Sequence, residues 1–393
     1  MTRQVYDIAV VGAGMVGAAL ALALAREGFE VTLIETRAPA RWRSDDEIDL
    51  RVVALAASSI ALFERLDVWA AIRDARACAY RRMRVWDALA PGELGFDAAD
   101  SGANALGYIV ENRLIAHTLW QVAQTHAQIA MHCPARVAAT EVEGERRTLT
   151  LDDGSRIAAR LVVAADGAES ALRELVGIQT HDRDYAQRAV VAHVAHERAH
   201  EATAWQRFLP HATLAFLPLA DGRSSIVWSL PDDEAQRVLA LDDATFCTEL
   251  GTAFDFRLGR VTATTARAAF PLRMKLVERY LAPRFALIGD AAHVVHPLAG
   301  QGVNLGLRDV DALVAALTEA RAAKRDIASE TVLRRYERRR RSDNDLSARA
   351  FDAIQRVFGS EAMPLAALRG AGLAIVDRVA PLKQLFVRHA AGG

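Results

Sequence analysis

Residues 5–35 read VYDIAVVGAGMVGAALALALAREGFEVTLIE. The first seven form an apolar run with the length of a buried parallel strand. The next six match GxGxxG, in which the first glycine permits a tight turn, the second lets the backbone approach a pyrophosphate, and the third lets helix and strand pack closely. These glycines are Gly12, Gly14 and Gly17. The order strand, turn, helix predicts a dinucleotide-binding unit.

The acid that ends the second strand narrows the choice of ligand. The helix runs to about Glu27, Gly28 is suited to end it, and residues 30–34 form a strand before Glu35. Glu35 lies close to the position, about 20 residues on, where an acid binds ribose hydroxyls. Its charge would repel a 2′-phosphate, which favours FAD or NAD over NADP. The alternative is an apolar helix whose glycines match by coincidence.

The composition is typical of a soluble globular protein. The 393 residues, 52% hydrophobic and 25% charged, allow about two to three domains. A net charge of −1 argues against a nucleic-acid-binding protein, which would have a basic excess. Cys78, Cys133 and Cys247 lack metal-ligand or CxxC spacing, so we expect a reducing, cytoplasmic setting and no metal site.

One uncharged segment has an alternative interpretation. Residues 8–25 reach the lower length limit of a membrane span, and their position near the N-terminus would also suit a signal peptide. Asp7 precedes the run and three glycines interrupt it. The dinucleotide-binding unit explains each of these features, so we favour it over a span.

A second motif lies far downstream. Residues 285–309 read FALIGDAAHVVHPLAGQGVNLGLRD, an apolar strand that runs into Gly289 and Asp290, followed by a Gly-rich turn and an apolar helix from about Val303. An ionised carboxylate accepts hydrogen bonds from sugar hydroxyls. Free N–H groups at a helix start stabilise negative charge. Together they predict a site for a ribityl chain and an anionic ring, which is to say a flavin.

A third strand supports FAD over NAD. Residues 161–167 form an apolar run that ends in Asp166 and Gly167. Three strand ends spread along the chain suit a long cofactor that spans a domain. The alternative for residues 166–167 is an ordinary strand-to-turn Asp-Gly pair.

These motifs together resemble those of class A flavoprotein monooxygenases and, more narrowly, the aromatic-ring hydroxylases of ubiquinone biosynthesis. The resemblance extends from about residue 5 to residue 345 and is loose beyond it. It includes residues 49–55, 110–113, 203–210, 216–219 and 270–272. Residues 80–83, 96–99, 107–108 and 225–228 favour the demethoxyubiquinol hydroxylase branch.

The resemblance implies a role for particular residues. The pyrophosphate would be held by Gly12, Gly14, Met15, Val16 and Gly17, the ribose by Glu35, and the ribityl chain by Gly289 and Asp290. FAD would be approached by Arg51 and Arg113, and both FAD and a transient NADH or NADPH site would be served by Asp166 and Gly167. The isoalloxazine would have Pro297 beside it, and its pyrimidine end would face Gly300, Gln301, Gly302, Val303 and Asn304.

The implied reaction has two halves. NADH or NADPH reduces the flavin, and O2 then forms a flavin hydroperoxide that hydroxylates an electron-rich ring in a closed apolar pocket. The flavin performs the chemistry, so no catalytic side chain is assigned; Pro297 and His296 line the expected ring site. His293 and His296 suit local hydrogen bonding or a proton relay better than a metal, which would need further ligands.

The expected fold class is mixed α/β, similar to p-hydroxybenzoate hydroxylase. A Rossmann-like FAD-binding domain is assembled from residues 1–79, 104–180 and 275–340. A β-rich substrate domain comprises residues 80–103 and 181–274, whose apolar and alternating runs predict a sheet over the flavin. Residues 341–393 form a C-terminal helical region.

The C-terminal part is rich in arginine. Six arginines fall between residues 334 and 341, which is typical of a solvated helix face or of a surface that attracts anionic lipid or an acidic partner. Residues 364–389 mix apolar and basic side chains in an amphipathic pattern. Peripheral docking on the inner face of the membrane is therefore one hypothesis.

The preferred function is hydroxylation of a polyprenylated phenol or benzoquinol in ubiquinone biosynthesis, with FAD, NADH or NADPH, and O2, in contact with other proteins of the pathway. One alternative is a monooxygenase of a soluble aromatic compound. A halogenase is disfavoured because the chain lacks its WxWxIP motif. Two more functions stay open, those of a non-catalytic FAD-holding subunit of a biosynthetic complex and of a simple NAD dehydrogenase.

Overall fold

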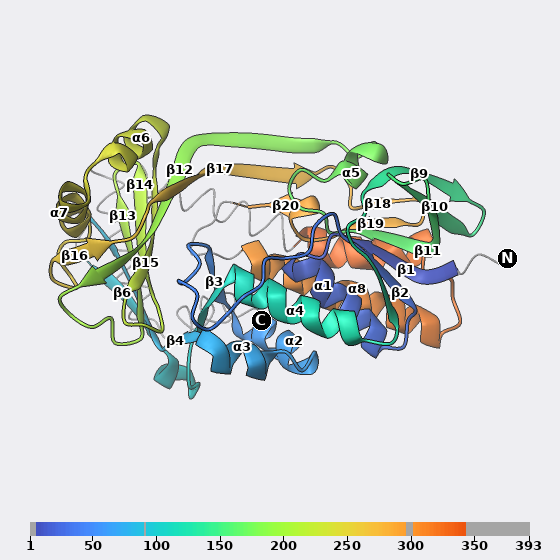
Figure 1. The fold of residues 1–393 in the computed structure, drawn as a ribbon, viewed down its shortest axis with the longest axis horizontal. Coiled ribbons are helices and arrows are strands. Elements are labelled where there is room, and N and C mark those ends of the chain that lie inside the picture. The colour runs from blue at the N-terminus through green and yellow to red at the C-terminus, as the bar shows by residue number, and fades with distance from the viewer. Residues whose placement is uncertain (1–4, 90–91, 296–301, 343–393) are drawn as a thin grey trace.

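The computed structural model describes residues 5–89, 92–295 and 302–342. The molecule is elongated, with a helix-covered sheet at one end and a large antiparallel sheet at the other (Figure 1). Two long strands run between the two ends, and a small third sheet lies at the junction. The predicted mixed α/β class is confirmed.

The first sheet has eight strands, of which five are parallel neighbours in the order β19, β11, β1, β2, β8. The strands are β1 (Val5–Val11), β2 (Val31–Ile34), β8 (Ile129–His132), β9 (Val137–Glu143), β10 (Arg146–Leu151), β11 (Arg156–Ala164), β18 (Leu281–Ala282) and β19 (Phe285–Leu287). Parallel strands covered on both faces are apolar along their length, and β2 and β19 are buried at every residue. This burial explains the uninterrupted apolar runs of the sequence.

Helices cover this sheet. They are α1 (Met15–Arg26), α2 (Ala57–Arg65), α3 (Trp69–Arg76), α4 (Asn112–Thr125), α5 (Ala171–Leu175) and α8 (Gly302–Ala322). Helix α1 packs against both α4 and α8, and its residues 17–25 are all buried. The uncharged run of residues 8–25 is thus the end of β1, the glycine turn and most of α1, not one continuous helix. None of the helices in residues 5–89, 92–295 and 302–342 has both the length and the hydropathy that a membrane crossing requires.

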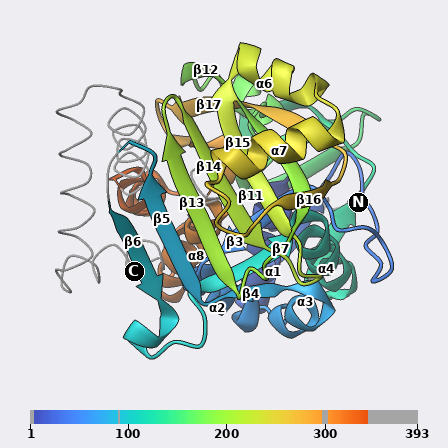
Figure 2. The ribbon, with the colours of Figure 1, turned by 90° about the vertical axis from the view of Figure 1, so that its left-hand side faces the viewer.

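The second sheet has nine strands, in the order β20, β17, β12, β15, β14, β13, β5, β6, with β16 beside β12. They are β5 (Arg82–Asp87), β6 (Glu93–Asp97), β12 (Thr180–His196), β13 (Thr203–Leu209), β14 (Ala212–Pro218), β15 (Ser224–Pro231), β16 (Val261–Thr264), β17 (Ala268–Val277) and β20 (His293–Val294). Helices α6 (Asp232–Ala240) and α7 (Asp243–Ala253) cover its outer face (Figure 2). A separate apolar core fills the space beneath them.

A three-stranded sheet joins the two halves. It consists of β3 (Val52–Leu55), β4 (Cys78–Tyr80) and β7 (Gly107–Glu111), with β7 in the centre. Its apolar side chains pack against the inner face of the second sheet, at Ala204 and Leu217. Two short 3-10 helices, η1 (Ala98–Ser101) and η2 (Gly289–Ala291), and a helix of residues 330–342 complete the described elements. The division of the chain into domains by residue number stays a prediction.

Candidate active site

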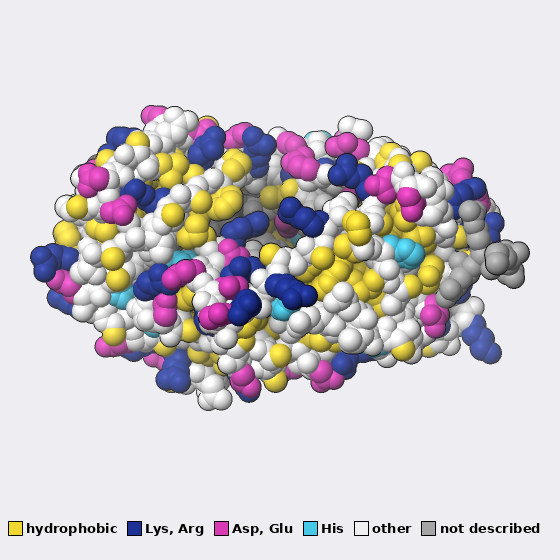
Figure 3. Space-filling view, in the orientation of Figure 1, with side chains coloured by type: hydrophobic (Ala, Val, Ile, Leu, Met, Phe, Trp, Pro, Cys, Tyr) yellow, Lys and Arg dark blue, Asp and Glu magenta, His cyan; other side chains and the backbone are white. Residues whose placement is uncertain are grey.

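A cleft opens at the carboxyl ends of β1, β2 and β11, where ligands of parallel α/β sheets bind. Its volume is about 450 Å³. It is lined by Val11, Gly12, Gly14, Ile34, Glu35, Thr36, Ala135, Arg136, Val137, Ala165, Asp166, Gly167, Glu169, Ala171 and Leu172. The ends of the first, second and third strands identified in the sequence therefore meet in one place. Figure 3 shows a hollow between the two halves of the molecule, with Lys and Arg side chains beside it. The cleft itself is lined only by residues of the half that contains the first sheet.

The three glycines of the loop have different surroundings. Gly12 has φ +98°, and a Cβ on it would lie 2.3 Å from the Ala165 carbonyl oxygen. A Cβ on Gly17 would lie 1.9 Å from the Gly12 carbonyl oxygen. A Cβ on Gly14 would have no atom of the described residues within 4 Å. Gly12 and Gly17 are thus required by the packing of the protein itself, whereas Gly14 leaves room at the cleft for a ligand.

Glu35 is fixed in the cleft by the glycine loop. The Ala13 amide donates to Glu35 Oε2 at 2.6 Å, and the Arg37 amide donates to Oε1 at 3.1 Å. A carboxylate has about four lone-pair sites, so these bonds leave acceptor capacity for hydroxyl groups. Thr36 Oγ1 also donates to Oε1 at 2.9 Å, so the side chain is oriented in the cleft, and its role in binding ribose stays a prediction.

Asp166 has a structural task in addition to its place in the cleft. Its Oδ1 accepts a hydrogen bond from Ser170 Oγ, and its Oδ2 accepts one from the Leu172 amide at 3.1 Å. Ser170 in turn caps α5 by accepting from the Arg173 amide. Burial raises the pKa of Asp166, although these hydrogen bonds oppose the rise. Asp166 thus stabilises the turn after β11 and also lines the cleft, so the two interpretations of this Asp-Gly pair do not exclude each other.

Val16 connects the two nucleotide motifs of the sequence. Gly289, at the end of β19, has φ +59°, and a Cβ on it would lie 3.2 Å from Val16 Cγ1. A Cβ on Gly306 would lie 2.7 Å from Val16 Cγ2. Val16 therefore packs between η2 and α8, while Met15, the first residue of α1, is partly buried against the same core.

Asp290 has an exposed side chain and makes no hydrogen bond to the described residues. The protein nonetheless crowds it, and this desolvation raises its pKa against the opposing charges of His293 and Arg51. The exposed carboxylate can accept hydrogen bonds from the hydroxyl groups of a ligand. Arg51 lies nearby with its guanidinium 5.6 Å from the centre of the Phe270 ring, and it forms no ion pair with a described residue.

A buried ionic cluster lies behind the Gly289–Asp290 turn. Asp309 Oδ2 accepts hydrogen bonds from the Gly289 amide at 2.9 Å and from His293 Nε2 at 2.6 Å. Its Oδ1 accepts one from Arg340 Nε at 2.7 Å. Asp309 is 0% exposed and Arg340 3%. Burial alone would raise the pKa of Asp309, but His293 and Arg340 outweigh it and hold the pKa below its usual value.

The start of α8 is tied to the small sheet. Gly302 and Val303 are partly buried in its first turn, and Asn304 is buried. The Asn304 amide nitrogen donates to the Ala54 carbonyl at 2.8 Å, and its oxygen accepts from Ser59 Oγ at 2.7 Å. The side chain of Asn304 thus positions the helix start. His296, Pro297, Gly300 and Gln301 lie outside the described residues.

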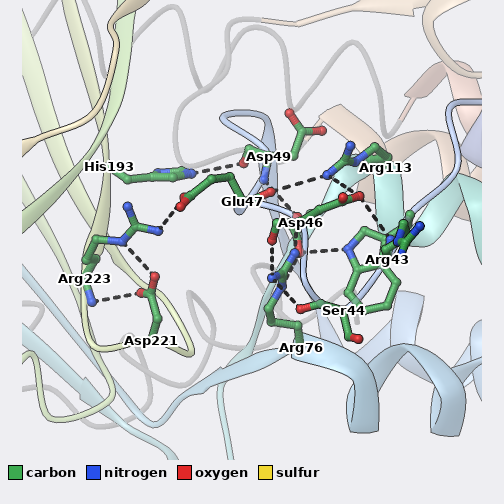
Figure 4. A network of polar contacts seen from close by, with 12 residues as sticks. Arg43, Ser44, Asp46, Glu47, Asp49, Arg76, Arg113, His193, Asp221 and Arg223 are labelled. Carbon is green, nitrogen blue, oxygen red and sulfur yellow. Dashed lines mark hydrogen bonds and ion pairs between the residues drawn. The ribbon is translucent and has the colours of Figure 1, made fainter.

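Arg113 is bound within the protein. Its Nη2 lies 3.2 Å from Asp46 Oδ2 and donates to the Glu47 carbonyl at 3.3 Å (Figure 4). The loop that contains these two residues is anchored at buried Glu111, which accepts from Arg76 Nε at 2.9 Å. Arg113 therefore supports the loop that leads to Arg51, and a direct contact with the cofactor stays a prediction.

The same loop also contacts the second sheet. Glu47 lies 3.3 Å from Arg223, and the Asp49 carbonyl accepts a hydrogen bond from His193 Nε2 at 3.1 Å (Figure 4). A carbonyl can only accept, so Nε2 holds the proton of His193. Burial lowers the pKa of His193, which keeps the ring neutral near pH 7.

A smaller cavity of about 60 Å³ lies between the small sheet, the second sheet and the start of α8. It is lined by Ala54, Ala56, Tyr80, Met83, Ile109, Ala204, Trp205, Gln206, Ala215, Leu217 and Asn304. Asn304 and Ala54 place it beside the helix start that the sequence predicts to face the flavin ring. Its mainly apolar lining matches the closed apolar pocket expected of the substrate site.

Several residues of the site could not be identified from the sequence. Asp309 falls within the motif of residues 285–309. Its burial could have been recognised because it is an acid on the face of α8 that otherwise consists of apolar residues such as Leu305, Leu313 and Ala316. Arg340 was assigned to an arginine-rich surface, but its side chain is buried against Asp309. Gln206 gave no signal, because alternation along β13 predicts its face and not its contacts.

The described residues fit FAD, because the glycine loop leaves room at Gly14, Glu35 is oriented, and Asp290 makes no hydrogen bond to any of them. Fold and site define an FAD-dependent monooxygenase. The chain belongs to the FAD binding domain family, whose model matches residues 5–346. The resemblance inferred from the motifs and the predicted cofactor, FAD, are both confirmed.

The relatives are more specific. The chain is 40% identical over 392 residues to the 3-demethoxyubiquinol 3-hydroxylase of Escherichia coli strain K12, with 100% of each chain covered. It is 37% identical over 389 residues to the ubiquinone hydroxylase UbiL of Rhodospirillum rubrum, covering 99% of this chain and 90% of that one. The structure of PqsL from Pseudomonas aeruginosa in complex with 2-aminobenzoylacetate is similar in fold, with a TM-score of 0.76, 23% identity, and coverage of 95% and 100%.

Proposed function

We propose that this protein hydroxylates the ring of a polyprenylated phenol or benzoquinol in ubiquinone biosynthesis, with NADH or NADPH as electron donor and O2 as co-substrate. The observation that supports it most is the 40% identity, over the whole length of both chains, to a 3-demethoxyubiquinol 3-hydroxylase. A demethoxyubiquinol is the substrate that we favour.

The residues of the chain bind, orient and exclude water, and FAD, when bound, supplies the redox chemistry and the activation of oxygen. The glycine loop and Glu35 would hold the pyrophosphate and ribose, and Asp290 the ribityl hydroxyls. The first turn of α8 would place backbone N–H groups near the negative charge of a reduced ring. Asn304 holds that turn against β3, which fixes the site before any ligand binds.

The small cavity beside Asn304 supports an aromatic substrate. Its lining consists mainly of Ala, Leu, Ile, Met and Trp side chains, which would exclude water from the reacting ring. Its volume, about 60 Å³, is less than half of the roughly 150 Å³ of a cavity that binds benzene, so a ring would occupy it only in part or would have to widen it. A prenyl tail would have to extend beyond it.

The test is turnover of the purified holoenzyme with a short-tail demethoxyubiquinol under ¹⁸O2. We expect substrate-stimulated oxidation of NADH or NADPH and a product that carries one new ring hydroxyl labelled with ¹⁸O. A yellow protein with no stimulation by any quinol would favour the FAD-holding subunit. Stimulation only by soluble aromatics would favour a monooxygenase of another pathway.

Peripheral membrane contact is a further part of the proposal. Arg338 and Arg339 have exposed side chains next to each other on the helix of residues 330–342, whereas Arg334 pairs with Glu330 and Arg335 with Glu319. Each of these two exposed arginines would contribute about 1 kcal/mol to the free energy of binding to an anionic membrane surface. Sedimentation with vesicles that contain phosphatidylserine should show binding that falls with salt and weakens in an Arg338→Ser/Arg339→Ser variant; equal sedimentation of both proteins would contradict it.

A further inference from the structure

The small cavity contains two polar side chains that make no hydrogen bond to the described part of the chain. They are Gln206 on β13 and Tyr80 at the end of β4. The strands come from different sheets, so the two side chains reach the cavity from the substrate side and from the junction sheet. The remaining lining is apolar apart from Asn304, whose amide is already bonded to Ala54 and Ser59, and the indole nitrogen of Trp205, which is buried and has no partner among the described residues either.

Gln206 lies in the inner face of the second sheet. It is paired with Ala215 on β14 and with Val85 on β5, so its side chain shares a face with two apolar residues. Only 7% of the residue is exposed. Its side-chain amide makes no hydrogen bond within residues 5–89, 92–295 and 302–342. The amide thus borders the cavity with its hydrogen-bonding capacity unused by the described residues, which suits a polar group of a ligand there.

Tyr80 contributes a hydroxyl that stays neutral. Burial raises its pKa to about 12, and the hydroxyl makes no hydrogen bond to a described residue. A Cβ on Gly107 would lie 2.6 Å from Tyr80 Oη, so the glycine on the neighbouring strand makes room for the phenol ring. The side chain therefore has a defined place at the edge of the cavity.

We infer that the Gln206 amide and the Tyr80 hydroxyl bind the oxygen substituents of the substrate ring and select a neutral, oxygen-substituted ring such as a benzoquinol. The amide oxygen can accept a ring O–H, and the amide N–H and the tyrosine O–H can donate to a hydroxyl or methoxy oxygen. No Asp, Glu, His, Lys or Arg is among the described residues that line the cavity. A ring that must lose a proton before it reacts would find no base among them, whereas a benzoquinol is electron-rich while neutral.

This inference rests on the proposed function, and the experiment separates the two. Gln206→Leu and Tyr80→Phe are made in the full-length holoenzyme, with Gln187→Leu as the matched control. Gln187 is on the same sheet, but its amide is away from the cavity and donates to the His211 carbonyl at 2.9 Å. FAD content should match the wild type in all three, and the Gln187→Leu control should also keep the wild-type rate of NADH oxidation without substrate.

With a short-tail demethoxyubiquinol, each cavity variant should raise KM about 2- to 10-fold, the loss expected for one or two neutral hydrogen bonds. The fraction of NADH that yields hydrogen peroxide instead of product should also rise, because the ring is less well oriented. The control should retain wild-type KM and coupling. An analogue without the methoxy oxygen should bind less well to wild type, and Gln206→Leu should discriminate less between the two rings.

Binding is measured separately, from the change in flavin absorbance on titration with the quinol. If wild type binds the quinol and Gln206→Leu weakens binding, the inference stands even where no product forms and the proposed function fails. If both cavity variants keep wild-type KM, coupling and discrimination, the inference is wrong while the proposed function survives. If wild type neither binds nor converts any quinol, both are wrong.

Discussion

Two groups of buried polar side chains near the expected ring site differ in one respect. In the cluster behind the Gly289–Asp290 turn, both carboxylate oxygens of Asp309 are hydrogen-bonded. In the cavity under the second sheet, Gln206 and Tyr80 have no hydrogen-bond partner among the residues that the structure describes. Asp309, whose bonds are complete, holds the fold, whereas Gln206 and Tyr80 line a cavity in which a ligand can bond to them. The cavity is essential to this distinction, because buried Thr32 Oγ1 and Trp228 Nε1 also have no partner among the described residues and line neither cavity.

The two acids of the flavin motif repeat this contrast over a short distance. Burial raises the pKa of Asp290, whereas His293 and Arg340 hold that of Asp309 below its usual value. At neutral pH a raised pKa in the folded state means that the ionised Asp290 lowers stability, and a lowered pKa means that the ionised Asp309 increases it. Solvent screens the effect at Asp290, whose side chain is exposed, whereas Asp309 is fully buried.

The largest effect is expected at Asp309. Asp309→Ala leaves Arg340 buried without its partner and should lower the free energy of unfolding by about 3–5 kcal/mol, measured by urea denaturation. The control is Asp311→Asn on the same helix, whose carboxylate pairs with Arg65 at the surface and should change stability by about 0–1 kcal/mol. Equal losses in the two variants would contradict the assignment of Asp309 to the scaffold.

The glycine loop allows a second comparison. Gly17→Ala places a methyl group against the Gly12 carbonyl and should destabilise the protein by about 1–3 kcal/mol or more, with or without FAD. Gly14→Ala meets no described atom within 4 Å and should leave stability without FAD unchanged. It should instead raise the Kd for FAD, followed by flavin fluorescence quenching, because the methyl group blocks close approach of the pyrophosphate. Unchanged FAD affinity in Gly14→Ala would exclude this role.

His193 is an intermediate case and should give the smallest effect. Its Nε2 is bonded to the Asp49 carbonyl, but its buried Nδ1 has no partner among the described residues, and burial lowers its pKa from 6.5. Above pH 6.5 both folded and unfolded chains hold it neutral, and as pH falls below 6.5 the unfolded chain takes up the proton first, so stability declines. His193→Gln keeps a donor for the carbonyl and cannot titrate. The loss of stability of this variant between about pH 7 and 5 should be smaller than that of wild type. Equal losses in the two proteins would show that His193 is not a source of the pH dependence.

The sequence predicted the elements that repeat a local pattern. The strand, glycine turn and helix at residues 5–26 and the strand ending at Gly289 follow from apolar periodicity and from glycines that local geometry requires. The flavin motifs could be recognised because each lies in a continuous segment.

The contacts between distant segments could not be predicted. Asn304 meets Ala54 and Ser59, and Arg340 meets Asp309, only because the chain folds α8 against β3 and returns the helix of residues 330–342 beside it. A run of arginines indicates a charged surface on average, and nothing local marks the one that turns inward. Gln206 looks like any polar residue in an alternating strand until its neighbours on β5 and β14 are known.

The central claim is that Asp290 serves a ligand whereas Asp309 serves the fold, and variants at these two positions test it most directly. Thermal unfolding of Asp290→Asn and of Asp309→Ala would be measured without FAD and with saturating FAD. Asp290→Asn should match or exceed the stability of wild type without FAD and gain less on adding it, since its carboxylate no longer accepts the ribityl hydroxyls. Asp309→Ala should be unstable in both conditions. A loss of stability without FAD in Asp290→Asn, or a wild-type gain with FAD, would contradict the claim.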